Sequence, residues 1–78
     1  MKGFVELKLA LADYLGELRR RRGWTQTHVA KRLSSSQSRV AKMEAADPSV
    51  SVDLLVRSLL VLGASRKDVG RVIACRTA

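Results

Sequence analysis

The sequence predicts an all-α protein, built as one compact domain of five helices. Three observations lead to this prediction. Apolar residues recur at spacings of three and four along the chain, and no stretch alternates as a strand would. Serine or threonine precedes four of the five helical segments, where either residue can cap a helix N-terminus. The chain has 78 residues, which suits one small core and is too short for two.

The first predicted helix runs from Phe4 to Arg22, and Gly23 is its predicted stop. Its apolar stripe consists of Phe4, Leu7, Leu11, Tyr14 and Leu18, and it is widened by Val5, Leu9, Ala12 and Leu15. The N-terminal half is more apolar than one small core requires. We therefore expect it to pack against another subunit or against the C-terminal helix.

Two short helices follow, separated by only two serines. Thr25 is the candidate cap of a helix over residues 26–33, and Ser36 of a helix from Gln37 to about Ala45. Apolar residues at helical spacing predict that the two share a buried underside. Those residues are Val29, Ala30, Leu33, Val40 and Met43.

Asp47 and Pro48 end the third helix, because proline lacks a backbone N–H and disfavours helical geometry in the residue before it. Ser51 can cap a fourth helix over residues 52–62, closed by a glycine. Ser65 can cap a fifth, which continues to about Cys75. Their predicted inward residues include Leu55, Leu59, Leu62, Val69, Val72 and Ile73.

The net charge of +8 is concentrated in one segment of the chain. Between Arg19 and Lys42 there are eight basic residues and no acidic one, whereas seven basic and seven acidic residues cancel elsewhere. The eight are Arg19, Arg20, Arg21, Arg22, Lys31, Arg32, Arg39 and Lys42. This pattern is typical of a polyanion-binding face, although a solvated surface is the simpler alternative.

Several functional classes find no support in the sequence. The lone Cys75 fits a reducing compartment, and one cysteine with one histidine cannot supply the usual four ligands of structural zinc. No apolar run approaches the ~20 residues of a membrane span. His28 is expected on the surface of the second helix, without a catalytic role. We expect a cytoplasmic protein that is not an enzyme and needs no metal or other cofactor.

Two short helices joined by a tight turn can place the second helix in the major groove of double-stranded DNA. Ala30 supplies the small residue at the contact of the two helices. The outward positions are Gln37, Ser38, Arg39 and Lys42. Glutamine can pair with adenine, and arginine or lysine with guanine. Gln37 and Arg39 are therefore the leading candidates for base reading, and the helix N-terminus at Ser36 suits a phosphate.

The segment TQTHVAKRLSSSQSRVAKMEA closely resembles the helix-turn-helix of the Cro and phage-repressor (XRE-type) DNA-binding proteins. The resemblance extends from about Leu15 to Ser65, and includes LRRRRGWTQ before the motif and DPSVSVDLLVRSLLVLGAS after it. It implies a lambda-repressor-like fold, with the motif at about residues 25–45 of a single domain spanning residues 1–78.

The resemblance also implies roles for individual residues. Gln26 would contact a phosphate, whereas Gln37, Ser38 and Lys42 would face base edges. Arg19 would pair with Glu44 at the end of the recognition helix, which is a structural role. Arg22 and Lys31 are candidate phosphate contacts, with a solvated surface as the alternative reading.

The sequence departs from the family pattern at three positions. Ser34 stands where glycine is usual, and Ser35 where an apolar residue is usual. Trp24 replaces an aliphatic residue, and we expect it to be a large core anchor behind the second helix.

The main functional hypothesis is a homodimeric, sequence-specific DNA-binding regulator, expected to repress from a palindromic operator. The alternative is an antitoxin that binds a RelE-like toxin and autoregulates its operon, because DPSVSVDLLVRSLLVLGAS resembles HigA-like antitoxins. Surplus apolar surface on the first helix and around Val69, Val72 and Ile73 predicts the dimer. Residues 1–15 and 65–78 are thus the candidate dimerisation segments.

Overall fold

The computed structural model describes residues 2–77, with the side chains of residues 6–75. Its helices are α1 (Lys2–Arg21), α2 (Gln26–Arg32), α3 (Gln37–Glu44), α4 (Val52–Val61) and α5 (Arg66–Thr77). The described residues contain no strand, so the all-α fold of five helices is confirmed. Each predicted boundary is within two residues of the observed one. The side chains of Phe4 and Val5, predicted members of the first apolar stripe, lie outside the described residues.

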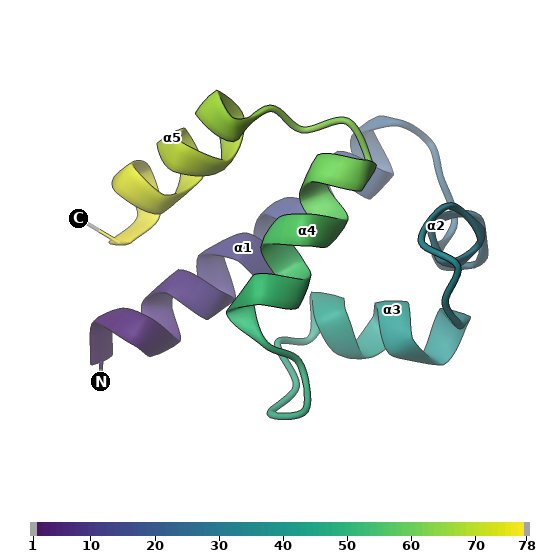
Figure 1. Ribbon diagram of the computed structural model, residues 1–78, viewed down its shortest axis with the longest axis horizontal. Coiled ribbons are helices and arrows are strands. Elements are labelled where there is room, and N and C mark those ends of the chain that lie inside the picture. Colours follow the sequence, from purple (N-terminus) through teal and green to yellow (C-terminus); the bar gives the residue numbers. More distant parts are fainter. Residues whose placement is uncertain (1, 78) are drawn as a thin grey trace.

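The helices surround one core to which all five contribute. α1 and α4 cross in the middle of the molecule, α5 lies on one side, and α2 and α3 lie on the other (Figure 1). The largest fully buried side chains are Leu11, Leu15, Val29, Val40, Met43, Leu55, Leu59 and Leu62. The first turn of α1 and the last turn of α5 lie on the side of the molecule away from α2 (Figure 1).

Four helices begin at a serine or threonine that accepts a backbone hydrogen bond. The hydroxyls of Thr25, Ser36 and Ser51 accept from the N–H three residues later, at 3.0, 3.1 and 3.0 Å. Ser65 forms a reciprocal pair, in which Asp68 N donates to its hydroxyl and Ser65 N donates to Asp68 Oδ2, both at 3.0 Å. Hydrogen bonding from Ser65 to the Asp68 carboxyl, led by the bond from Ser65 N, lowers the pKa of that carboxyl. The four predicted caps are confirmed.

Four helices also end alike, with one residue in the left-handed conformation and a hydrogen bond that closes the last turn. The left-handed residues are Gly23 (φ 71°), Ser34 (φ 53°), Ala46 (φ 53°) and Gly63 (φ 103°). After α2, Ser35 N donates to Ala30 O at 2.8 Å, and the equivalent bond after α3 joins Asp47 N to Lys42 O at 3.0 Å. This is the Schellman geometry. The two glycines were predicted helix stops, but an alanine carries no such signal.

The apolar face of α1 packs against α5. Val69 is buried, and Ile73 packs against the core from the same helix. The expectation that the first helix would pack against the C-terminal helix is therefore confirmed. Large apolar side chains that remain exposed among the described residues are Leu9, Leu60 and Val61.

Ser34→Gly should raise the free energy of unfolding by about 0.5–1 kcal/mol. A left-handed backbone costs a residue with a Cβ ~1–2 kcal/mol, and the extra chain entropy of glycine offsets part of the gain. The matched control is Ser35→Gly in the same turn, because Ser35 does not have a positive φ. Urea denaturation of both variants measures the difference. Equal destabilisation by the two glycines would contradict the account of the turn.

Candidate nucleic-acid interface

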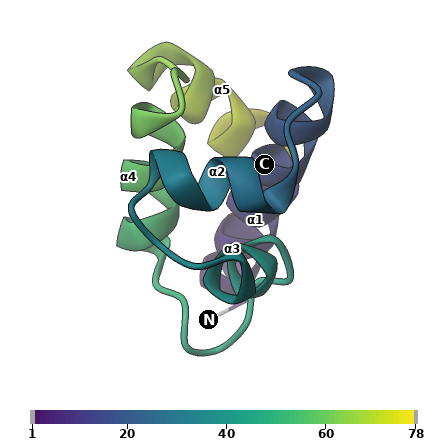
Figure 2. The same ribbon diagram turned by 90° about the vertical axis from the view of Figure 1, so that its right-hand side faces the viewer.

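α2 and α3 form a helix-turn-helix. α2 is seen end-on in Figure 1 while α3 lies across the view, and Figure 2 shows the reverse, so the two helices are steeply crossed. Ala30 is buried where they meet, and Val29, Val40 and Met43 fill the shared underside. The left-handed Ser34 and the capping Ser36 set the direction in which α3 leaves the turn. A serine at the usual glycine position thus adopts the glycine-like conformation.

The outer face of α3 is exposed. The four predicted base-reading residues, Gln37, Ser38, Arg39 and Lys42, all lie on this face. Among the predicted phosphate contacts, Ser36, Arg22 and Lys31 are exposed and Gln26 is partly buried. The fold therefore brings the four predicted base-reading residues together on α3, and Gln26 lies beside Gln37. The DNA contacts of these residues stay predictions.

A chain of hydrogen bonds connects Gln37 to the body of the domain. Gln37 Nε2 donates to Gln26 Oε1 at 2.6 Å, and Gln26 Nε2 donates to Glu44 Oε1 at 3.4 Å. These bonds use one N–H of Gln37. Its other N–H and its Oε1 are the donor and acceptor that a glutamine presents to adenine. The side chain is thus oriented before any ligand arrives, as precise recognition requires.

This series of hydrogen bonds ends at the ion pair between Arg19 and Glu44. The family resemblance implied this pair, and the structure contains it. Arg19 Nε lies 2.6 Å from Glu44 Oε2, and Arg19 Nη2 donates to Glu44 Oε1 at 3.1 Å. The side chains are 16% and 13% exposed. Hydrogen bonding to Glu44 raises the pKa of Arg19, against the effect of burial. Arg19 Nη1 also donates to Trp24 O at 3.1 Å, so the pair ties α1 to both ends of the motif.

Trp24 agrees only in part with the expected core anchor. It packs against the core but is only partly buried, and its ring supports two guanidinium groups. Arg32 Cζ lies 4.3 Å from the ring centroid and Arg22 Cζ lies 5.2 Å from it. Arg32 Nε also donates to Nε2 of the exposed His28 at 3.0 Å. The indole therefore holds arginines at the surface by cation–π contact, which an aliphatic residue could not do.

The sequence did not predict that the loop between α3 and α4 borders the candidate site. A cavity of ≈290 Å³ lies between this loop and α3, lined by Ser36, Ser38, Arg39, Lys42, Ser49 and Val50. Ser49 donates from its hydroxyl and its N–H to Asp47 Oδ2, at 2.6 and 2.9 Å, and these bonds lower the pKa of Asp47. Lys8 Nζ donates a hydrogen bond to Asp47 O at 2.7 Å. The sequence Asp-Pro-Ser could have signalled such a turn.

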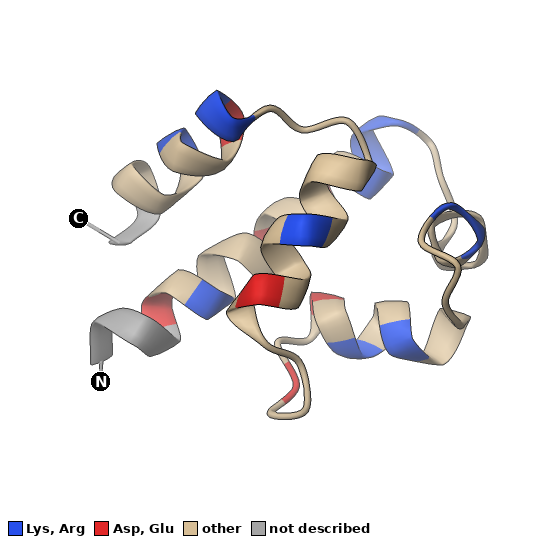
Figure 3. Cartoon of the chain, in the orientation of Figure 1, with Lys and Arg blue, Asp and Glu red and all other residues tan. Residues whose placement is uncertain are grey.

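Positive charge is concentrated on the side of the molecule that carries the motif. Lys and Arg on the end of α1, on α2 and on α3 have few acidic neighbours, whereas those on the first half of α1, on α4 and on α5 share their helices with acidic residues (Figure 3). The acid at the end of α3 is Glu44, which is paired with Arg19. The surface around α3 therefore attracts polyanions.

Comparison with known proteins agrees with this geometry. A family model described as a helix-turn-helix domain matches residues 10–72, which contain the whole motif and parts of α1 and α5. The chain belongs to this family, which indicates a DNA-binding regulator and is typically non-enzymatic. No curated protein matches the chain significantly, and no solved structure does so either.

Two further features of the described residues concern other classes of protein. None of their helices has the length and apolarity needed to cross a membrane. They also contain no group of three or more His, Cys, Asp or Glu residues that could hold a metal ion.

Arg19→Met should lower the free energy of unfolding by about 2–3 kcal/mol, because it leaves the Glu44 carboxylate largely buried without its cation. The control is Arg21→Met, which removes an exposed arginine from the last position of the same helix and should change stability by about 0.5 kcal/mol or less. Urea denaturation measures both. If the two variants lose equal stability, the ion pair is not what joins α1 to α3.

Proposed function

We propose that the protein is a sequence-specific transcriptional repressor that binds a palindromic operator as a homodimer. The observation that carries this proposal is Gln37, exposed on α3 and oriented by Gln26, which is itself held through Glu44 and Arg19. A side chain that only solvates a surface gains nothing from being ordered in this way, because ordering it costs side-chain entropy.

The proposed complex places α3 in the major groove. Gln37 reads adenine and Arg39 reads guanine, while Ser38 and Lys42 contact neighbouring base edges. Gln26, Arg22 and Lys31 contact phosphates on the flanks of the groove. The free N–H groups at the start of α3, beside Ser36, donate hydrogen bonds to another phosphate. The cavity next to Ser49 offers the hydroxyls of Ser36 and Ser38 to the sugar-phosphate backbone.

The homodimer follows from the limited reach of one motif. A single recognition helix contacts only one short half-site, and paired half-sites of helix-turn-helix proteins lie about one helical turn apart. α5 already covers much of the apolar face of α1, so the surplus surface of the first helix supports an interface less strongly than its sequence suggested. Residues 1–15 and 65–78 stay candidate segments, and Leu60 and Val61 at the end of α4 add exposed apolar surface.

An antitoxin that binds a RelE-like toxin is the second candidate function. Exposed Leu60 and Val61 favour it, since both lie in the segment that resembles HigA-like antitoxins. We rank it second because the other apolar surface that suggested a protein partner, that of α1, packs against α5. A small RelE-like toxin encoded beside this chain would favour the antitoxin role over simple repression.

Selection from a random DNA pool should yield a palindromic site. For that site, Arg39→Ala should cost about 1–3 kcal/mol of affinity and relax the preference at one base pair in each half-site. Lys31→Ala should instead weaken binding to all sequences and lower the slope of log affinity against log salt by about one for each motif bound. Lys67→Ala, on the exposed side of α5, is the matched control and should change neither quantity. Recovery of no preferred sequence, or a flat salt response, would reject the proposal.

Sedimentation velocity should show a dimer at micromolar concentration in the presence of the selected palindrome and in its absence. The expected reason is burial of apolar surface that a chain of this size leaves exposed. A monomer that binds the palindrome one copy at a time, with no cooperativity between half-sites, would reject the dimer while leaving DNA recognition intact.

A further inference from the structure

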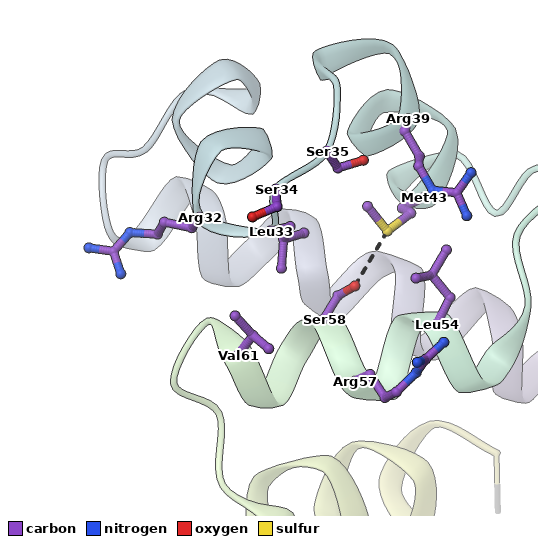
Figure 4. A pocket seen from close by; sticks show the side chains of 10 residues that line it. All are labelled: Arg32, Leu33, Ser34, Ser35, Arg39, Met43, Leu54, Arg57, Ser58 and Val61. Carbon is purple, nitrogen blue, oxygen red and sulfur yellow. Dashed lines mark hydrogen bonds between the residues drawn. The ribbon is translucent and has the colours of Figure 1, made fainter.

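A second cavity lies on the other side of the turn between α2 and α3, where that turn faces α4. Its volume is ≈450 Å³, within the range of pockets that hold small molecules. Leu33, Met43, Leu54 and Val61 give it apolar walls, and Arg39 and Arg57 lie at one end (Figure 4). The cavity is thus an open groove with both apolar and hydroxyl-bearing walls, and it is cationic at one end.

The charges around this cavity have one sign, because no acidic side chain lines it. Arg57 Nε lies 3.0 Å from Asp53 Oδ2, but these side chains are 68% and 77% exposed, and such surface pairs are weak. Arg32 contributes only its stem, since its guanidinium is on Trp24 and points away from the cavity (Figure 4). Arg39 and Arg57 are therefore the two cations that an anionic ligand would meet.

A buried hydroxyl supplies an independent observation. Ser58 is 4% exposed, and its Oγ donates to Met43 Sδ at 3.6 Å in the wall of the cavity (Figure 4). A thioether is a weak acceptor, so this hydrogen bond offsets little of the free-energy cost of removing the hydroxyl from water. A hydroxyl placed in this way can turn to a stronger acceptor that enters the cavity.

We propose that the cavity binds a small amphiphilic carboxylate, with its apolar body against Leu33, Met43 and Leu54 and its carboxylate between Arg39 and Arg57. Ligand pockets combine apolar walls with polar groups at fixed positions, and this cavity contains both. Guanidinium groups pair with carboxylates through charge-assisted hydrogen bonds, which are stronger than those to a neutral group.

The bound carboxylate also regulates DNA binding. Arg39 is shared between the cavity and the exposed face of α3, so a carboxylate that holds its guanidinium takes it away from guanine. Ligand and DNA then weaken each other's binding by the same factor. This regulatory step rests on the proposed DNA-binding function, whereas occupation of the cavity does not.

The probe for the cavity is 1-naphthoate, titrated into the isotope-labelled, DNA-free protein and followed by amide chemical shifts. Saturable binding is expected, with the shifts concentrated in the turn, the start of α3 and the middle of α4. The uncharged isostere 1-naphthamide should bind about tenfold more weakly, because it cannot form the charge-assisted bonds. Equal affinity of acid and amide, shifts scattered over the surface, or no saturation would overturn the site.

Arg57→Gln should weaken naphthoate binding about tenfold. The variant should fold normally, because Arg57 is exposed on α4. Arg66→Gln removes an exposed arginine from α5, outside the cavity, and should leave the affinity unchanged. An equal loss in both variants would mean that net charge alone attracts the probe, which overturns the site.

DNA competition tests the regulatory step separately. Saturating naphthoate should weaken binding to the selected DNA about tenfold in the parent protein, and much less in Arg57→Gln at the same concentration. Binding of naphthoate with unchanged DNA affinity would overturn the regulatory step and leave the site standing. If the protein selects no DNA at all, the proposed function fails, and the titration without DNA still decides the site.

Discussion

The ion pair between Arg19 and Glu44 is the interaction on which the rest of the site depends. It is largely buried, and it fixes the C-terminal end of α3 to α1, a helix that belongs to the core rather than to the motif. Glu44 also accepts a hydrogen bond from Gln26, and Gln26 accepts one from Gln37. One carboxylate thereby fixes the C-terminal end of α3 in space and contributes to the orientation of a side chain near its start. A hydrophobic contact could do the first but not the second, because it has no direction.

Short-range signals account for most of the fold that could be predicted from the sequence. A serine or threonine before each of α2 to α5, and Gly23 and Gly63 after α1 and α4, mark boundaries through one hydrogen bond or one backbone angle. Helical spacing of apolar residues then identifies Leu11, Leu15, Leu55 and Leu59 as core. These features depend on neighbours in the sequence, which is why they could be predicted. The left-handed Ala46 could not, because the geometry around it, not its side chain, imposes that angle.

The candidate site was less predictable because its geometry depends on contacts between distant segments. The outward face of α3 follows from spacing alone, so Gln37, Ser38, Arg39 and Lys42 could be placed on one surface. The bond from Gln37 to Gln26 joins residues 11 positions apart, and only the crossing of α2 over α3 brings them together. Trp24 shows the same limit. Its size predicts burial, whereas its contacts with Arg22 and Arg32 depend on how α1 ends and α2 begins.

The two ends of α3 are held by different means. Its C-terminal end carries a largely buried ion pair to α1. Its N-terminal end is joined to α2 by the exposed contact of Gln37 with Gln26 and by a turn in which Ser34 has φ 53°. A cavity of ≈450 Å³, not packed side chains, lies between that turn and α4. Movement of this end would break no buried charge pair, so adjustment to a groove or to a ligand would cost least near Gln37, Ser38 and Arg39, the residues proposed to read bases.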